Sequence, residues 1–529
     1  MTVNRYRRLP VGIQSFKVIR EENYLYVDKS DIVWNMVNLG DKYNYLSRPR
    51  RFGKSVLVDT LEAYLEGRKD LFEGLKIMQM EKDWKQYPVI RLDMSRGGAS
   101  EETLRSYLNL RFKDYEEKYN ITPDPTAMLA DRFHAIIATA YKQTGLRVAV
   151  LIDEYDSPLQ HSWRTPEHEK CTGVYREVFA ILKADDEYEQ FIFITGITKF
   201  TQISLFSVLN NLSNISFTPE YAAICGITEE EMKENFMPEI KKMSEANNWS
   251  VEETHDRLKA YYDGYHFCRH NMVDVYNPYS LVNALNSKEI INFWASSGAT
   301  SLLPKFVDNA ELRMKNFENC RIMRNTLEMS DVTGGGAELF LYQSGYLTIK
   351  DSDEFGYILG FPNEEVKQAL YETVLPALTM RERSDIQSIQ ANLYAQLGMG
   401  QIGDAMRSLK ALIADVPYSN KKLASMDMEE RYRLIISTIL NAIGLSVEVE
   451  KMISTGRIDM TVKTSRYIYV IELKLRNNGG KDAATEQILN RQYMEPFKAD
   501  KRKVIGLGIE LDEEGKGLLD WKRTESFCE

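Results

Sequence analysis

Residues 43–55 read YNYLSRPRRFGKS, and this stretch predicts the fold of the N-terminal part of the chain. The run Tyr43–Leu46 is apolar and aromatic, which is typical of a buried β-strand. Gly53, Lys54 and Ser55 follow and lead into a segment of helical periodicity, Val56–Leu65. A phosphate-binding loop belongs at such a place, because the backbone N–H groups and the dipole of a helix N-terminus attract phosphate.

The loop departs from the usual pattern G-x-x-x-x-G-K-[ST] at one position, where Arg48 replaces the first glycine. The chemistry still suits a nucleotide, because Lys54 would place its charge between the β- and γ-phosphates and Ser55 would offer its hydroxyl to Mg²⁺. The alternative is a basic turn that precedes a helix. The residues we expect to bind the nucleotide are Arg48, Arg50, Arg51, Phe52, Gly53, Lys54 and Ser55.

A second run, Val148–Glu154 (VAVLIDE), has the form of a Walker B strand, in which apolar residues end in Asp-Glu. Asp153 would help to hold Mg²⁺, and Glu154 would orient or deprotonate the attacking water. An isolated Asp-Glu pair after a strand is more often a solvated turn. The phosphate loop upstream favours the functional interpretation.

Strands and helices alternate through this part of the chain. The predicted strands are Tyr43–Leu46, Pro88–Met94, Arg147–Ile152 and Gln190–Thr195. This alternation predicts a parallel α/β sheet, with its ligand at the carboxyl ends of the strands. The strand at Pro88–Met94 lies between the two motifs, an order typical of NTPases that insert one strand there and use a catalytic glutamate.

The end of the fourth strand offers candidates for a contact with the γ-phosphate. These are Thr195, Thr198 and Lys199, of which we assign Thr198 to the nucleotide site. The alternative is a polar strand end with no such role. The sequence places no arginine finger.

The middle of the chain, residues 211–424, is mainly helical by pattern. Residues 339–366 read as a short helix, two strands joined by a DSDEFG turn, and a further helix starting near Pro362. That order is compatible with a winged helix. We therefore expect three parts, residues 1–210, 211–424 and 425–529, in agreement with the about three or four domains that this length predicts.

The third part carries a second constellation. A helix over Met428–Leu445 precedes strands at 446–451, 457–463 and 467–474, a helix at 483–493 and a strand at 503–508. Glu472 and Lys474 are two residues apart on one strand and so share a face, and a neighbouring strand can bring Asp459 opposite them. The two carboxylates and the Leu473 carbonyl would bind Mg²⁺ or Mn²⁺, which lowers the pKa of a bound water. Lys474 would position that water or stabilise the developing charge.

This D-x(n)-E-x-K arrangement is typical of PD-(D/E)XK nucleases, although an E-x-K pair on an exposed strand usually forms a solvated face. Two further residues are possible accessories to the site. Glu430, or its neighbour Glu429, could add a metal ligand or a supporting acid from the preceding helix. Gln487 lies on the helix after the E-x-K strand.

Composition excludes several classes of protein. Hydrophobic residues make up 43% and charged residues 27% of the 529 residues, as in ordinary globular domains. The formal net charge of −10 excludes a uniformly basic nucleic-acid binder but not a local basic face. No apolar run approaches the roughly 18 residues of a membrane helix, and the five scattered cysteines favour a reducing compartment. We expect a cytoplasmic protein with no membrane partner.

The chain resembles the AAA-ATPase-like family that carries a C-terminal PD-(D/E)XK nuclease domain. The phrases that carry the resemblance are LPVGIQSF, YLYVDKSDIV, YLSRPRRFGKSVLVDTL, VLIDEYDSPL, FITGITKF, YDGYHF, VYNPYSL, YQSGYLTI and FPNEEV. The family loop commonly reads RPRRFGKS, so Arg48 is a family trait, and its Walker B phrase continues to an aspartate matched by Asp156. The resemblance implies an ASCE-type P-loop ATPase that uses ATP. It also implies that Tyr26–Lys29 belongs to the nucleotide module.

These expectations define two hypotheses. In the first, an ATP-hydrolysing module controls a Mg²⁺- or Mn²⁺-dependent nuclease that cuts DNA or RNA. In the second, the chain is an ATP-dependent switch that binds nucleic acid or a protein partner through a catalytically silent nuclease fold. The sequence does not separate DNA from RNA or endonuclease from exonuclease, and a homo-oligomer is compatible with it.

Overall fold

The computed structural model describes residues 7–122, 124, 126–199, 211–270, 273–296, 303, 317–329, 336–379, 383–414 and 427–525. The chain divides into two compact units. The first contains residues 1–307 and 316–363, and the second contains residues 308–315 and 364–529. The boundary expected at 424/425 lies outside the described residues.

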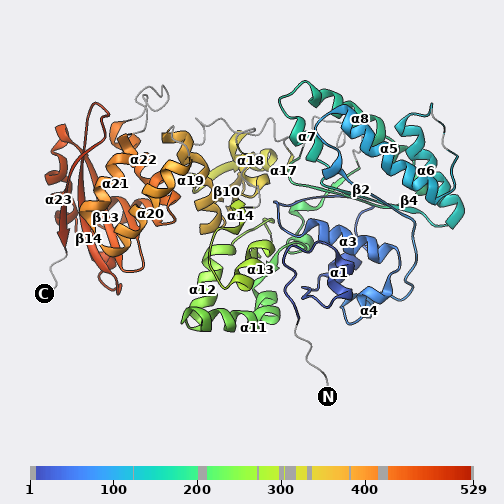
Figure 1. Ribbon diagram of the computed structural model, residues 1–529, viewed down its shortest axis with the longest axis horizontal. Coiled ribbons are helices and arrows are strands. Elements are labelled where there is room, and N and C mark those ends of the chain that lie inside the picture. The colour runs from blue at the N-terminus through green and yellow to red at the C-terminus, as the bar shows by residue number, and fades with distance from the viewer. Residues whose placement is uncertain are drawn as a thin grey trace, which may run out of the picture. The chain divides into compact units, whose positions relative to one another are not determined.

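The first unit is built on the predicted parallel sheet (Figure 1). Its strands are β1 (Tyr43–Ser47), β2 (Val89–Asp93), β3 (Val148–Asp153), β4 (Glu189–Gly196) and the short β5 (Ser213–Asn214), in the order β2-β3-β4-β1-β5. All four pairings are parallel. The strand that separates β1 from β3 in space is β4, whereas β2 lies at the edge of the sheet.

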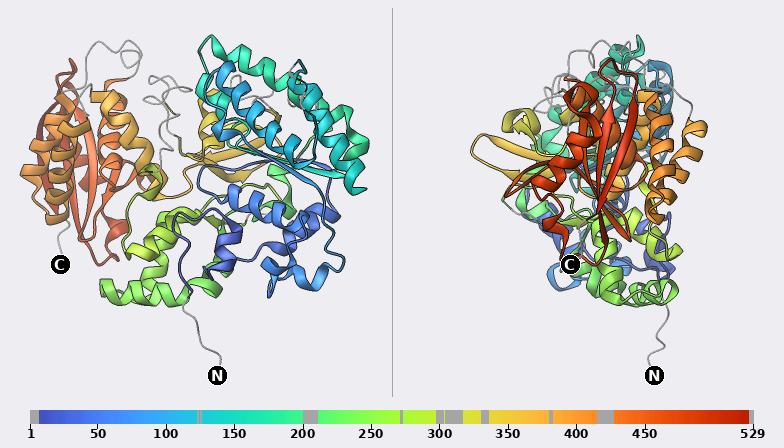
Figure 2. Two further views of the ribbon diagram at one scale, coloured as in Figure 1. Left: turned by 45° about the vertical axis from the view of Figure 1, so that its right-hand side comes forward. Right: turned by 90° about the vertical axis from the view of Figure 1, so that its left-hand side faces the viewer.

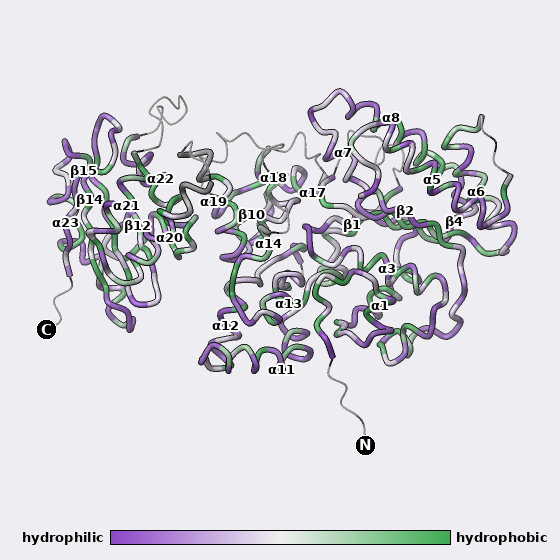
Figure 3. Tube along the Cα trace, viewed as in Figure 1, coloured by the Kyte–Doolittle hydropathy of each residue, from purple (hydrophilic) through white to green (hydrophobic). Residues whose placement is uncertain are grey.

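Helices cover both faces of this sheet, which gives three layers (Figures 1 and 2). One face carries α1 (Phe16–Glu21) and α3 (Lys54–Leu65), and the other carries α5 (Glu101–Lys118), α6 (Leu129–Thr144) and α8 (Glu167–Phe179). The strands β3 and β4 are almost entirely buried. The hydrophobic stretches in the sheet contrast with the more hydrophilic helix α11 (Glu229–Asn247) (Figure 3).

The remaining elements of the first unit follow β5 or lie outside the sheet. Helices α11, α12 (Val251–Tyr262) and α13 (Pro278–Ser287) form one hydrophobic cluster together with Leu25 from the N-terminal segment. The further elements are α2 (Ser30–Asn38), α4 (Ile77–Met80), α7 (Ser157–Ser162), α9 (Ile181–Ala184), β6 (Ile227–Thr228), β7 (Val275–Tyr276), α14 (Phe293–Ser296) and α17 (Arg324–Met329).

The helix–hairpin–helix order expected near residues 339–366 is present. Helix α18 (Gly336–Ser344) precedes β9 (Thr348–Ser352) and β10 (Gly356–Gly360), and the next helix, α19 (Glu364–Thr379), begins in the second unit. Strand β8 (Cys320–Met323), which the sequence did not predict, completes an antiparallel sheet in the order β8-β10-β9.

The second unit contains a five-stranded mixed sheet in the order β11-β12-β13-β14-β15. Its strands are β11 (Ser446–Ile453), β12 (Gly456–Lys463), β13 (Tyr467–Leu475), β14 (Lys503–Leu511) and β15 (Leu518–Glu525). Only β13 and β14 are parallel, and β15 was not expected from the sequence. The helices besides α19 are α20 (Arg383–Met399), α21 (Ile402–Ala414), α22 (Met428–Ala442) and α23 (Gly480–Asn490).

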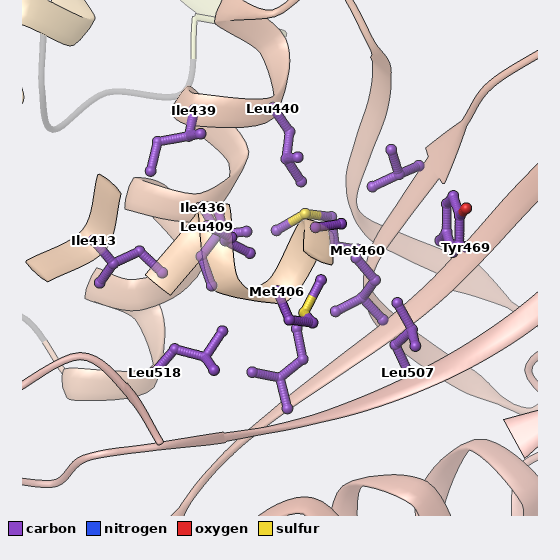
Figure 4. Packing of buried hydrophobic residues seen from close by; sticks show 14 of the residues in the cluster. Met406, Leu409, Ile413, Ile436, Ile439, Leu440, Met460, Tyr469, Leu507 and Leu518 are labelled. Atoms are coloured by element: carbon purple, nitrogen blue, oxygen red, sulfur yellow. The ribbon is translucent and has the colours of Figure 1, made fainter. Parts of the chain in front are cut away.

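The sheet of the second unit has a hydrophobic cluster on each face. Residues of α20, α21 and α22 pack on one face, where Met406, Ile436 and Met460 meet (Figure 4). Ile488 of α23 packs on the other face with Ile458 and other apolar residues. Of the helices described, none is both long and apolar enough to cross a membrane.

Candidate nucleotide and nuclease sites

The phosphate-loop residues line a cavity of about 500 Å³ in the first unit. This volume is within the range of small-molecule sites, roughly 300–1,000 Å³. Arg50, Arg51, Phe52, Gly53, Lys54 and Ser55 all lie in its wall, together with Glu154. Gly53 precedes α3 in the left-handed region (φ 86°), a conformation that glycine adopts without a steric cost.

The side chain of Lys54 folds back onto its own loop. Its Nζ donates to the carbonyl oxygens of Arg48 and Pro49, both at 2.9 Å. Only 6% of the residue is exposed. Burial lowers the pKa of the Lys54 ammonium, and the nearby carboxylates of Glu154 and Asp153 oppose that shift. The Lys54 ammonium therefore binds two neutral carbonyl oxygens at the cavity, and the oxygens of a phosphate can replace them.

The two motifs meet at Ser55 and Asp153. Burial raises the pKa of the Asp153 carboxyl, and the nearby Ser55 hydroxyl opposes that shift. Glu154 follows with a left-handed backbone (φ 48°), an unusual conformation for this residue type that turns it into the wall of the cavity. Burial raises the pKa of Glu154, and Lys54 opposes this.

Arg48 does not line the cavity with the other loop residues. It is 1% exposed, and its guanidinium donates to the carbonyl oxygens of Ser216 at 2.9 Å and Tyr221 at 3.0 Å. The guanidinium also lies 4.2 Å from the ring centroid of Phe267. The Arg48 side chain thus connects the loop to the segment after β5. In this position its guanidinium does not face the cavity where a phosphate would bind.

Thr198 is also turned away from the cavity. Its hydroxyl donates to Asp156 Oδ2 at 2.7 Å and accepts from Gln160 at 2.9 Å. The other sensor candidates are similarly engaged, since Thr195 donates to the carbonyl of Leu46 and Lys199 donates to the carbonyl of Glu328. None of the three lines the cavity.

The sequence did not identify most of the cavity wall. Apolar residues from distant segments complete it: Pro10, Ile13, Leu25, Ile224, Phe236 and Val282. Lys29, which the resemblance placed in the nucleotide module without a role, also lines the cavity, and its Nζ lies 2.7 Å from Glu231 Oε2 on α11. Such contacts join residues about 200 positions apart, and no local pattern marks them.

The second site lies in the second unit. Residues of α22, β12, β13 and α23 enclose a cavity of about 270 Å³, lined by Asp427, Glu429, Glu430, Arg433, Arg457, Asp459, Glu472, Lys474 and Gln487. The antiparallel register pairs Met460 with Ile471, and Asp459 and Glu472 are the next residues on each strand. The structure therefore brings together the three side chains that the sequence placed in one site.

Glu472 lines this cavity but is only 1% exposed. Burial raises the pKa of its carboxyl above the ordinary range, and the neighbouring Asp459 adds to this. Gln487 Nε2 donates to Glu472 Oε1 and is 3.3 Å from the hydroxyl of Tyr493. This hydrogen bond orients the buried carboxylate of Glu472. Gln487 therefore lies beside the residue to which the sequence made it a possible accessory.

Lys474 and Glu429 face each other across the cavity. Lys474 Nζ lies 3.8 Å from Glu429 Oε2, and Glu429 Oε1 accepts from the backbone N–H of Leu475 at 3.2 Å. Glu429 is thus tied to the strand that carries Lys474. Glu430 lines the same cavity as an exposed residue.

Arg433 is a cation of this site that was not predicted from the sequence. Arg433 Nη1 lies 3.1 Å from Asp459 Oδ1, and its Nη2 lies 2.9 Å from Glu450 Oε1. Arg433 follows Glu429 by four residues on α22, so the two share a face of the helix. That spacing was the available signal.

The donor set of the nuclease site fits a hard divalent cation. Asp459 and Glu472 offer carboxylate oxygens, which Mg²⁺ and Mn²⁺ prefer. Within the described ranges, no group of three or more His, Cys, Asp or Glu side chains is placed to hold a metal ion. A cation here would depend on two carboxylates, with backbone oxygen and water completing its shell.

Comparisons with known proteins agree with this division of sites. Residues 10–206 match the family model described as "Predicted AAA-ATPase", and residues 427–521 match the model of the PD-(D/E)XK nuclease superfamily. The chain is also similar to a protein of Azotobacter chroococcum mcd 1 described as "Uncharacterized protein in vnfD 5'region". The two are 30% identical over 531 residues, which cover 97% of this chain and 98% of the relative.

Proposed function

Because the chain belongs to the family of AAA-ATPase-like proteins with a C-terminal PD-(D/E)XK nuclease superfamily domain, we propose that it hydrolyses ATP and cleaves phosphodiester bonds in DNA or RNA. The first activity would reside in the cavity around Lys54 and the second in the cavity around Glu472. Domains of these two families generally use a nucleotide and divalent metal ions. We further propose that the protein acts in the cytoplasm on nucleic acid.

One observation carries the nuclease proposal. Asp459, Glu472 and Lys474 converge in one cavity with Gln487, although they come from separate strands and a helix. A solvated strand face, the alternative interpretation of the E-x-K pair, would leave Glu472 in water. Instead Glu472 is buried, and its pKa is raised by that burial. A buried carboxylate with a shifted pKa beside a second one is typical of a functional site.

In the proposed ATPase step, Lys54 exchanges the carbonyl oxygens of its loop for phosphate oxygens. Ser55 and Asp153 would hold the Mg²⁺ ion of the nucleotide. Glu154 receives the proton of the attacking water or orients that water. The apolar end of the cavity accepts the base.

In the proposed nuclease step, Asp459 and Glu472 would hold the divalent cation. When bound, that cation lowers the pKa of a coordinated water and polarises the scissile phosphate. Lys474 positions the water or stabilises the charge that develops on the phosphate. Gln487 keeps Glu472 aimed into the cavity.

A second candidate is favoured by the charge of the nuclease cavity. Five carboxylates line it (Asp427, Glu429, Glu430, Asp459 and Glu472), against three cations (Arg433, Arg457 and Lys474). An excess of negative charge disfavours a phosphate unless a metal ion is bound. An ATP-dependent switch with a silent nuclease fold, binding nucleic acid or a protein elsewhere, would tolerate such a cavity.

The experiment that separates the two is cleavage of end-labelled single- and double-stranded DNA and RNA. The full chain is incubated with Mg²⁺ or Mn²⁺, with and without ATP, beside the Lys474→Ala variant. Cutting by the wild type alone supports the nuclease, and its ATP dependence tests coupling. Absence of cutting by protein that binds ATP would favour the switch.

A further inference from the structure

We propose that Arg433 takes the place of a second metal ion in the nuclease site, so that a single divalent cation binds between Asp459 and Glu472. The inference rests on the proposed nuclease function and adds a residue that the D-x(n)-E-x-K pattern does not contain. Both carboxylate oxygens of Asp459 accept a hydrogen bond. Oδ2 accepts the backbone N–H of Leu473 at 2.9 Å, and Oδ1 accepts Arg433 Nη1 at 3.1 Å.

Arg433 is held in this position from its other side. Glu450 Oε1 lies 2.9 Å from Arg433 Nη2, and the side chain of Arg433 is only 15% exposed. A guanidinium between two carboxylates is fixed by geometry as well as by charge. The guanidinium therefore places a permanent positive charge beside Asp459 Oδ1.

The backbone at Glu450 is strained in a way that serves this contact. Glu450 has φ 54° inside strand β11, a left-handed conformation that is unfavourable for a non-glycine residue. The strand pairing runs from Val449–Met460 to Lys451–Ile458 and omits both Glu450 and Asp459. The interruption thus falls at the two residues that bind Arg433. Strain of this kind persists where the surroundings impose it, often at functional sites.

Glu429 is already engaged by protein groups and is therefore a poor ligand for a second ion. Two-metal sites hold ions roughly 3.5–4 Å apart and need oxygen ligands for both. Glu429 is occupied by the N–H of Leu475, by Asn478 and by Lys474. Over the part of the chain that the structure describes, no set of three acidic, His or Cys side chains is placed to bind a metal.

A fixed guanidinium performs part of the work of a second ion. It offsets charge on Asp459, and its other N–H groups can donate to a phosphate oxygen. Its presence should also weaken the binding of the single cation, because like charges repel at short range.

The test is Mn²⁺ binding to the full chain, measured by calorimetry in the absence of nucleotide. Comparing the wild type with Asp459→Asn counts the ions of this site, and we expect a difference of one. In Arg433→Gln we expect Mn²⁺ to bind about tenfold more tightly, since a competing positive charge is removed. A difference of two ions, or affinity that is unchanged or weaker in Arg433→Gln, would overturn the inference.

Arg502→Gln is the matched control. Arg502 Nη2 lies 2.6 Å from Asp500 Oδ2 in the same unit, and Arg502 is not among the residues that line the nuclease cavity. We expect its Mn²⁺ affinity to equal that of the wild type. If wild type and Asp459→Asn bind equal numbers of ions, the proposed metal site itself is wrong, which distinguishes the two failures.

Two variants keep the test decisive if Arg433→Gln does not fold, as judged by circular dichroism. Arg433→Lys retains the charge and should bind Mn²⁺ as the wild type does. Glu450→Gln leaves Arg433 in place but removes the carboxylate that offsets it, so Mn²⁺ should bind more weakly while the ion count stays at one. Tighter binding in Glu450→Gln would contradict the electrostatic role of Arg433.

Discussion

Asp156 Oδ2 accepts both the backbone N–H of Thr198, at 2.6 Å, and the hydroxyl of Thr198, at 2.7 Å. The same oxygen accepts the N–H of Ile197 at 3.0 Å and a hydrogen bond from Gln160. One buried carboxylate thereby joins the segment after β3, which carries Glu154, to the segment after β4. The relative position of these two strand ends depends on it.

Replacing Asp156 should therefore damage the ATPase site without removing any residue from its cavity. In Asp156→Ala we expect ATP hydrolysis to fall at least about tenfold and the thermal midpoint to fall by several degrees, because hydrogen bonds to a charged group contribute about 1.5–3 kcal/mol each. Nucleotide affinity, measured by fluorescence, should change less than the hydrolysis rate. Normal hydrolysis in a folded Asp156→Ala protein would contradict the positioning role.

Lys54 and Lys199 form a matched pair for the nucleotide site. Lys54 lines the cavity, whereas the Lys199 amine binds the carbonyl of Glu328 and lies outside the cavity wall. Lys54→Ala should reduce ATP hydrolysis by at least about a hundredfold, since the removed charge contacts the transferred phosphate. Lys199→Ala should retain most of the activity. Comparable losses in the two variants would show that Lys199 reaches the nucleotide after all.

The nuclease site should bind its metal more tightly as pH rises. Burial raises the pKa of Glu472 above the ordinary glutamate value, so the carboxyl keeps its proton at a pH where an exposed glutamate is ionised. Mn²⁺ binding requires the ionised form, and it should strengthen between pH 6 and 8 with the release of a proton. Calorimetry in buffers of different ionisation enthalpy measures that proton. In Glu472→Gln the affinity should be low at every pH, and a wild-type affinity independent of pH would argue against the buried acid as a ligand.

Glu189 provides a stability prediction remote from both sites. It is fully buried in β4, and burial raises its pKa to about 8, while the hydroxyl of Tyr43 donates to it at 2.8 Å. The folded state therefore holds a proton that the unfolded chain releases near pH 4.5. The contribution of Glu189 to stability should be fully present below about pH 4.5 and fall by up to about 1.4 kcal/mol per pH unit as the pH rises toward 8.

Glu189→Gln removes this titration, because the amide is neutral at every pH. At pH 8.5 we expect the variant to melt at a higher temperature than the wild type, and at pH 5.5 the difference should shrink. Thermal unfolding followed by circular dichroism at the two pH values gives the comparison. An equal difference at both would mean that Glu189 is ionised throughout.

The parts of the fold that were predictable are those encoded by local pattern. A pattern of no more than about a dozen residues predicts each of three features. They are the strand ending at Ser47, the glycine before α3 and the apolar run ending at Asp153. The parallel sheet follows from their alternation with helices, and this prediction is confirmed. The Asp459, Glu472 and Lys474 set was likewise readable, because strand periodicity decides which side chains share a face.

What could not be predicted depends on contacts between distant segments. Arg48 has the sequence position of a phosphate ligand, yet its guanidinium donates to carbonyl groups 168 and 173 residues away. Thr198 lies at a strand end suited to contact with a γ-phosphate, but its hydroxyl donates to Asp156. In the sequence, nothing separates Arg433 from other cations on helices. Its role depends on Glu450, which strand β11 places beside it. Tertiary contacts, which have no local signature, decide each of these cases.

The last strand, β15, pairs with β14 from Ile505 to Leu511 and so occupies the backbone hydrogen-bonding groups along that side of β14. Most of β14 is buried and apolar. A chain shortened after Asp512 would leave the backbone groups along this side of β14 unpaired. Another chain could then add a strand to that exposed edge. Such a truncated protein would be lost to aggregation while every residue of the nuclease cavity remained in its sequence, so inactivity of a C-terminal truncation says nothing about catalysis.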